Sequence, residues 1–200
     1  MIKKLSLLLL LIAFLRFGLQ AQNYDEEALI QRRAAEMVSQ LGDYLNYMAD
    51  KNKKLSLRQR YRDKALNLFI SKGEPYKLGG REFPAVSMQT TSTNSKVVKT
   101  TPMGEYFTNL INIKYRNVSL TTTEVGKIKV SSLKKIDEDT YQCTCYIEQV
   151  FRGYGTDGRP LYGDITRKSV QCIISVEQTI DGTEYIVRLG NITATHTERI

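Results

Sequence analysis

The sequence predicts an α+β domain in which helices from the first half of the chain pack on an antiparallel sheet formed by the second half. Between residues 24 and 71, apolar residues recur at steps of three and four, the period of an amphipathic helix. From residue 114 onward, segments of high β-propensity alternate with short turn sequences. No repeat or linker divides the chain, so we expect a single domain over residues 22–200.

Residues 1–21 have the layout of a secretory signal peptide. Lys3 and Lys4 precede an almost unbroken apolar run over residues 5–14, and Ala21 is a small residue at a suitable cleavage point. The run is too short to span a membrane comfortably. We therefore expect an exported protein of a bacterial envelope, periplasmic or extracellular, whose mature chain begins near Gln22.

The first two predicted elements are helices. Ile30, Leu41 and Met48 belong to an apolar stripe that predicts a helix over residues 24–49. Ser56 and Gln59 fit a capping box, which predicts a second helix over residues 56–71. The predicted buried residues of this second helix are Leu57, Tyr61, Ala65, Leu68 and Phe69.

The middle of the chain is less regular. Gly79 and Gly80 predict a turn, and residues 83–93 predict a strand. Thr101 and Pro102 indicate the start of a short third helix, with the proline at its first helical position.

The second half of the chain predicts four strands, at residues 115–133, 140–152, 164–178 and 184–196. A turn centred on Asp157-Gly158 places Cys143 opposite Cys172. A turn centred on Asp181-Gly182 places Val176 opposite Val187. Both registers bring apolar faces together, so one apolar face crosses three strands and the helices are expected to cover it.

This order of elements resembles the NTF2-like superfamily, also described as the cystatin-like α+β fold. The resemblance covers most of the mature chain and rests on the order and lengths of the elements, without a diagnostic motif. It implies a curved antiparallel sheet that wraps the helices into a cone, with a cavity between the sheet and the long helix. In that superfamily the cavity can hold an enzyme site, bind a small molecule or be filled by side chains, so the fold leaves the function open.

The composition limits the classes of partner that this protein is expected to bind. The net charge of +8 falls to +5 once the three basic residues of the signal peptide are removed, and an exported protein is a poor candidate for nucleic-acid binding. No second segment approaches 18 apolar residues, so we expect no membrane-spanning helix in the mature chain. A basic cluster could contact an anionic surface peripherally, although a solvated helix face is the preferred interpretation. This cluster comprises Lys51, Lys53, Lys54, Arg58, Arg60, Arg62 and Lys64.

The three cysteines favour a structural role. Cys143, Cys145 and Cys172 fall on the apolar strand face, where small sulfur side chains are usually core residues. A Cys143–Cys172 disulfide is a hypothesis for an oxidising compartment, and it leaves Cys145 as a thiol.

Three residues are catalytic candidates. Asp164 and Tyr162 share one side of a predicted strand, where a carboxylate in an apolar pocket could act as a base, although Asp164 lies near a hairpin end where charges are usually solvated. His196 is the only histidine, which excludes a histidine-based metal cluster, and we expect neither a metal nor another cofactor.

The hairpin over residues 152–163 is the preferred binding patch, because aromatic and arginine side chains are common at interfaces. Its predicted binding residues are Phe151, Arg152, Tyr154, Arg159 and Tyr162. The sequence favours a non-enzymatic module that binds a partner protein, a second copy of itself or a small hydrophobic ligand. The alternative is a small-molecule enzyme of the isomerase or dehydratase type, with its site inside the cone and Asp164 as the acidic group.

Overall fold

The computed structural model describes the backbone of residues 2–93 and 97–200 and the side chains of residues 26–93 and 97–200. In this part of the chain the helices are α1 (Ile2–Ala49), α2 (Leu55–Leu66) and α3 (Met103–Ile111), with 3₁₀ turns at Ile70–Gly73 and Val125–Lys127. The strands are β1 (Tyr76–Leu78), β2 (Arg81–Phe83), β3 (Ser87–Thr90), β4 (Lys99–Pro102), β5 (Asn117–Thr122), β6 (Lys129–Val130), β7 (Lys134–Lys135), β8 (Thr140–Tyr154), β9 (Pro160–Thr179) and β10 (Gly182–Arg199).

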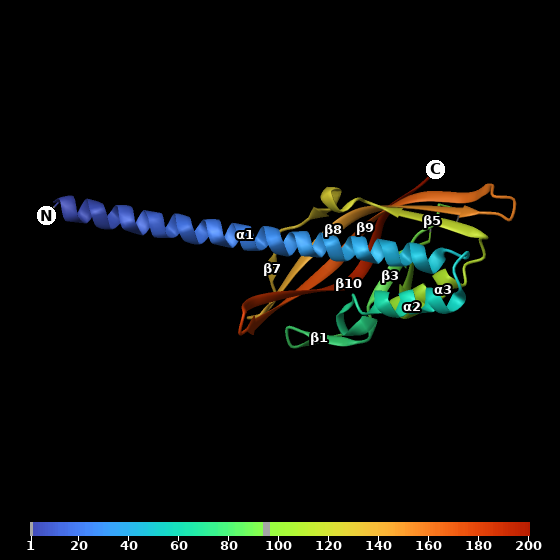
Figure 1. Ribbon diagram of the computed structural model, residues 1–200, viewed down its shortest axis with the longest axis horizontal. Helices are drawn as coiled ribbons and strands as arrows, with labels where there is room; N and C mark the ends of the chain where they lie inside the picture. The colour runs from blue at the N-terminus through green and yellow to red at the C-terminus, as the bar shows by residue number, and fades with distance from the viewer. Residues whose placement is uncertain (1, 94–96) are drawn as a thin grey trace.

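The main sheet has the strand order β4-β3-β10-β9-β8-β5, and β6 and β7 also pair with β8. The pairings are antiparallel except for the parallel contact between β3 and β10. Figure 1 shows α1 lying along the curved sheet, with α2 and α3 beside the C-terminal end of α1. The chain therefore has the predicted α+β fold, with helices packed on a curved, mostly antiparallel sheet.

Helix α1 supplies much of the core, as its periodicity predicts. Ile30, Ala34, Leu41, Leu45 and Met48 are all at most 3% exposed. The predicted signal peptide lies in the part of α1 whose side chains fall outside the described residues, and it stays a prediction. Across the described residues, no helix is long and apolar enough to cross a membrane.

Helix α2 differs from the prediction at both ends. It begins at Leu55 after Lys54, without a side-chain cap, so the proposed capping box at Ser56 is wrong. It ends at Leu66, and Ser71 and Lys72 then adopt φ values of 49° and 54° in the following turn.

Arg58 of α2 takes the buried position that the sequence assigned to Leu57, which is exposed instead. Arg58 is 7% exposed; its Nε donates a hydrogen bond to the Met48 carbonyl at 2.8 Å, and its Nη2 donates to the Ile111 carbonyl. These carbonyls lie in the last turns of α1 and α3, where helices lack internal donors. One member of the predicted basic cluster therefore joins three helices instead of facing solvent.

The middle of the chain also differs in detail. Gly79 and Gly80 form the predicted turn, with φ values of 53° and 72° that suit glycine. The strand predicted over 83–93 is shorter, since β2 ends at Phe83 and β3 covers only Ser87–Thr90. Pro102 precedes α3 as its N-cap instead of occupying the first helical position. The strand predicted over 115–133 is divided into β5, a 3₁₀ turn and β6.

The two long hairpins test the predicted registers. Cys143 lies opposite Cys172, as the turn at Asp157-Gly158 predicts. In the next hairpin, Val176 lies opposite Tyr185 and not Val187, because the two-residue turn is Ile180-Asp181. The error is two residues, so the same side chains still face the core.

Candidate functional site

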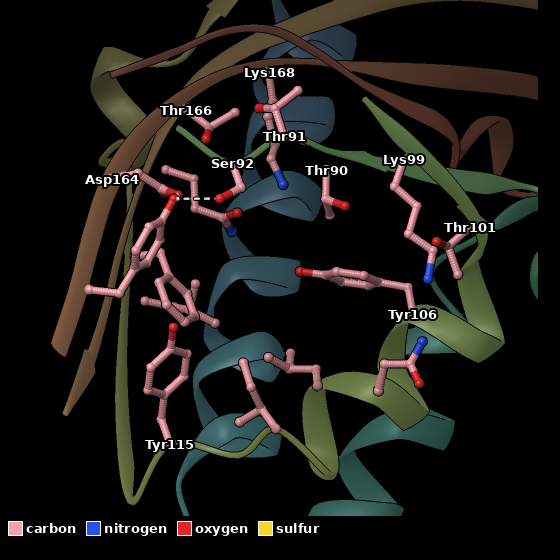
Figure 2. A pocket seen from close by; sticks show the side chains of 17 residues that line it. Thr90, Thr91, Ser92, Lys99, Thr101, Tyr106, Tyr115, Asp164, Thr166 and Lys168 are labelled. Atoms are coloured by element: carbon pink, nitrogen blue, oxygen red, sulfur yellow. Dashed lines mark hydrogen bonds between the residues drawn. The ribbon is translucent and has the colours of Figure 1, made fainter. Parts of the chain in front are cut away.

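A cavity of about 390 Å³ opens between the concave face of the sheet and helix α3 (Figure 2). Its apolar wall is formed by Leu110, Ile113, Leu120 and Phe151. Its polar lining includes Thr101, Tyr106, Tyr115, Gln149, Tyr162, Asp164, Thr166 and Lys168. A cavity that combines apolar side chains with polar groups is the usual form of a small-molecule site.

Strand β9 contributes three polar side chains to this cavity. Asp164, Thr166 and Lys168 alternate along the strand and therefore point to the same face. They are 6%, 4% and 5% exposed, respectively. Strand β9 begins at Pro160, so Asp164 lies inside the strand; the expectation that a hairpin end would keep it solvated is wrong.

Asp164 and Tyr162 form a hydrogen-bonded pair at the cavity wall. The Tyr162 hydroxyl donates to Asp164 Oδ2 at 2.5 Å, and Ser92 Oγ lies 3.2 Å from the same hydroxyl. Burial raises the pKa of Asp164, and the Tyr162 hydrogen bond and the charge of Lys168 offset part of this rise. The sequence predicted that these two residues share one strand face, and the structure places both on the cavity wall.

Lys168 was not among the predicted site residues. Its Nζ lies 3.5 Å from Met88 Sδ, and Figure 2 shows its side chain extending toward the cavity. Burial lowers the pKa of Lys168 to about 8, against the opposing effect of Asp164. The sequence did contain an indication of this position. Lys168 precedes Cys172 by four residues, so strand alternation places it on the same face as Cys172 and Ile174.

Tyr106 reaches the cavity from the opposite side. It projects from α3, and Figure 2 shows its hydroxyl directed toward the middle of the space. Burial, with a smaller contribution from the charge of Asp164, raises the pKa of Tyr106 to about 12. This phenol is therefore protonated at neutral pH and can donate a hydrogen bond.

Aromatic rings form one wall of the cavity. Phe151 packs edge-on to Tyr115 with ring centroids 5.7 Å apart, and it lies 6.0 Å from the ring of Tyr162. Gly153 makes room for Tyr115, because a Cβ at this glycine would lie 2.6 Å from the ring.

The structure divides the predicted binding patch. Phe151 and Tyr162 line the cavity, whereas Arg152 and Tyr154 line a separate hollow of about 420 Å³ that Tyr162 also borders. Arg159 is exposed and lies 3.5 Å from Asp157. The five residues therefore do not form one surface, and binding of a partner protein there stays a prediction.

His196 lies away from the cavity. Its side chain is 55% exposed, and its Nε2 is 3.0 Å from Glu198 Oε1. In the part of the chain with described side chains, no group of three or more His, Cys, Asp or Glu residues is placed to hold a metal ion.

The three cysteines lie together in the core. Cys143, Cys145 and Cys172 are all buried, and the sulfurs of Cys145 and Cys172 are 3.7 Å apart. The Cys143–Cys172 disulfide stays a prediction.

No protein-family model and no curated protein matches this sequence. Among solved structures, the chain is similar to a candidate scytalone dehydratase from Novosphingobium aromaticivorans, with 13% identity and a TM-score of 0.44 over 88% of this chain and 91% of that one. A protein from Kribbella flavida has 16% identity and a TM-score of 0.41 over 86% and 95% of the two chains. A type 2 hexachlorocyclohexane dehydrochlorinase, LinA, has 10% identity and a TM-score of 0.37 over 88% and 93%. The chemistry of this cavity is argued from its own residues.

Proposed function

We propose that the protein binds a small, largely apolar organic molecule inside the cone and transfers a proton on it, with Asp164 as the general base. The observation that carries this proposal is a buried carboxylate, held by Tyr162 at 2.5 Å, on the wall of a cavity that also has an apolar side. This is the isomerase or dehydratase type of chemistry that the sequence offered as its alternative.

The environment of Asp164 suits a base. A raised pKa brings a carboxylate closer to neutral pH, where a general base is both ionised and basic enough to accept a proton. The Tyr162 hydrogen bond engages Oδ2 and fixes the orientation of the carboxylate. Burial also removes water that would otherwise solvate the carboxylate and weaken its basicity.

Removal of a proton leaves negative charge on the substrate, and the cavity has donors to receive it. The Tyr106 hydroxyl, directed into the cavity from α3, can donate a hydrogen bond to a developing oxyanion. Loss of a proton beside a carbonyl then gives an enolate that can be reprotonated elsewhere or can expel a leaving group. The first outcome is an isomerisation and the second is an elimination.

A base in an apolar pocket can be tested without the natural substrate. The probe is 5-nitrobenzisoxazole: loss of its carbon-bound proton breaks the N–O bond and gives a coloured nitrile phenolate. We expect the wild-type protein to accelerate this elimination and Asp164→Asn to lose at least about 100-fold of the rate. Asp63→Asn is the matched control, because Asp63 is an exposed carboxylate on α2 paired with Arg62.

The outcomes separate the two function classes. An equal rate for wild type and Asp164→Asn refutes the role of Asp164. Binding of the probe, detected by ligand NMR, without elimination supports the non-enzymatic ligand-binding module instead. Co-purification with a second chain and no probe binding supports the partner-protein hypothesis.

We also infer that the protein works outside the cytoplasm of a bacterium, on the basis of its N-terminal sequence. The test is the intact mass of the protein isolated from its native cells. A chain that begins near Gln22 supports export, and a chain that retains residues 1–21 in the cytoplasm contradicts it.

A further inference from the structure

We propose that Lys168 anchors a carboxylate, so that the molecule bound in the cavity is a small organic carboxylate with an apolar body. The inference rests on the proposed function to the extent that the cavity must bind a small molecule. It adds the chemical class of that molecule, which neither the fold nor Asp164 specifies.

The first argument is the environment of the Lys168 ammonium. The residue is 5% exposed, and the contact that the structure gives its Nζ is the thioether of Met88 at 3.5 Å. A thioether is a weak acceptor, whereas an ammonium has three donors. Within the described side chains, none of the ion pairs involves Lys168. The charge of Asp164 acts on this ammonium, but the two groups form no ion pair. Because buried charges in proteins are normally paired directly, a ligand can supply the anionic partner that contacts Lys168.

The second argument is the end of the cavity at which Lys168 lies. Lys168 and Gln149 line the main cavity and also a void of about 10 Å³ behind it. This void is otherwise bordered mostly by apolar side chains, including Val38, Leu41 and Ile192. It offers little room for water to solvate the ammonium from behind, so the acceptor has to come from the main cavity.

The third argument is a second donor beside the lysine. Gln149 is 6% exposed and lies opposite Thr166 in the β8–β9 pair, which makes it a diagonal neighbour of Lys168. Diagonal neighbours are about 7–8 Å apart at Cα, within reach of long side chains. The amide group of Gln149 can donate to one carboxylate oxygen while Lys168 pairs with the other.

The acid and the ammonium lie at two separate points of the cavity wall, with Thr166 between them on β9. Asp164 and Lys168 are four residues apart on the same face of β9, about 13 Å along the strand. The apolar side chains of Leu110, Leu120 and Phe151 also line the space. A carboxylate held at Lys168 directs an apolar body along this wall and presents its far end to Asp164.

The test compares a carboxylate with its neutral isostere. The probes are 4-phenylbutyrate and 4-phenylbutanamide, and their affinities are measured by titration calorimetry at pH 7. We expect Lys168→Met to weaken binding of the carboxylate by at least about 30-fold and binding of the amide by no more than about threefold. Lys127→Met is the matched control, since it removes an exposed lysine that pairs with Glu124 and should leave both affinities unchanged.

Each outcome decides the proposal. No preference for the carboxylate in the wild type, or an equal loss for both probes in Lys168→Met, overturns the anchor and leaves the role of Asp164 to the elimination assay. Binding of neither probe to the wild type overturns the anchor together with ligand binding in the cavity.

If Lys168→Met fails to fold, the pH dependence of probe binding to the wild type tests the same proposal. Affinity for the carboxylate should fall as the pH rises through about 8, when the ammonium loses its proton, and affinity for the amide should not. The other titratable groups that line the cavity are Lys99, Tyr106, Tyr115, Tyr162 and Asp164. A pH-independent carboxylate affinity overturns the anchor.

Discussion

Replacement of Lys168 with methionine should stabilise the protein. Methionine is of similar length, carries no charge and suits the apolar surroundings of Met88 and the cavity wall. The wild-type ammonium is desolvated in the folded protein and hydrated in the unfolded chain, so folding opposes its protonation. A substitution that removes the charge removes this cost.

The magnitude follows from the pKa of Lys168. Burial lowers it from 10.5 to about 8. One pKa unit corresponds to about 1.4 kcal/mol, so the charged lysine costs about 3 kcal/mol of folding free energy at pH 7. For a chain of this size, 1 kcal/mol corresponds to about 2–4 °C in the unfolding midpoint, and Lys168→Met should therefore unfold about 6–12 °C higher than the wild type.

The pH dependence provides the sharper assay. Because the folded pKa lies below the unfolded pKa, the wild type regains stability as the pH rises from about 8 to 10.5 and loses it as the pH falls through 8. Urea unfolding of wild type and Lys168→Met should differ by about 3 kcal/mol at pH 7 and converge near pH 10.5. The Lys127→Met control should follow the wild type. A variant that is less stable than the wild type at pH 7, or a difference that stays constant with pH, refutes the reasoning.

Three further predictions concern the scaffold. Arg58→Ala leaves two helix-terminal carbonyls without their donor and should cost about 2–4 kcal/mol in urea unfolding, whereas an unchanged midpoint contradicts its structural role. Gly153→Ala places a Cβ 2.6 Å from the ring of Tyr115 and should lower stability by about 1–3 kcal/mol; a fully stable variant indicates that the ring has room to move. If the predicted Cys143–Cys172 disulfide forms, alkylation of the denatured protein labels one thiol before reduction and three after it, and three labels without reduction contradict the bridge.

The sequence alone predicted the features that depend on local patterns. The apolar stripe of α1 and the register that places Cys143 opposite Cys172 follow from side-chain periodicity and from a turn sequence, both of which act over short stretches of chain. The pairing of Asp164 with Tyr162 on one strand face follows from the same alternation.

The second hairpin shows where local patterns fail. The register of β10 shifts twice, between Leu189 and Ile192 and between Ala194 and His196. Within the first shift, the side chain of Asn191 accepts a hydrogen bond from the Ser87 backbone at 2.9 Å and so links β10 to β3. This contact joins residues about 100 positions apart in the chain, and turn residues give no sign of it or of the bulge beside it.

Only the tertiary structure shows which polar residues on the inward faces are buried and line the candidate site. Periodicity places Lys168 on a face with core residues, and it places Arg58 in a basic cluster beside the apolar stripe of the second helix. Both patterns are also compatible with exposed side chains. Whether such a side chain remains in water depends on what covers it: α1 and α3 in the case of Arg58, and β3, β8 and α1 in the case of Lys168. Burial is a property of the assembled layers, and so are the shifted pKa values of Asp164 and Lys168.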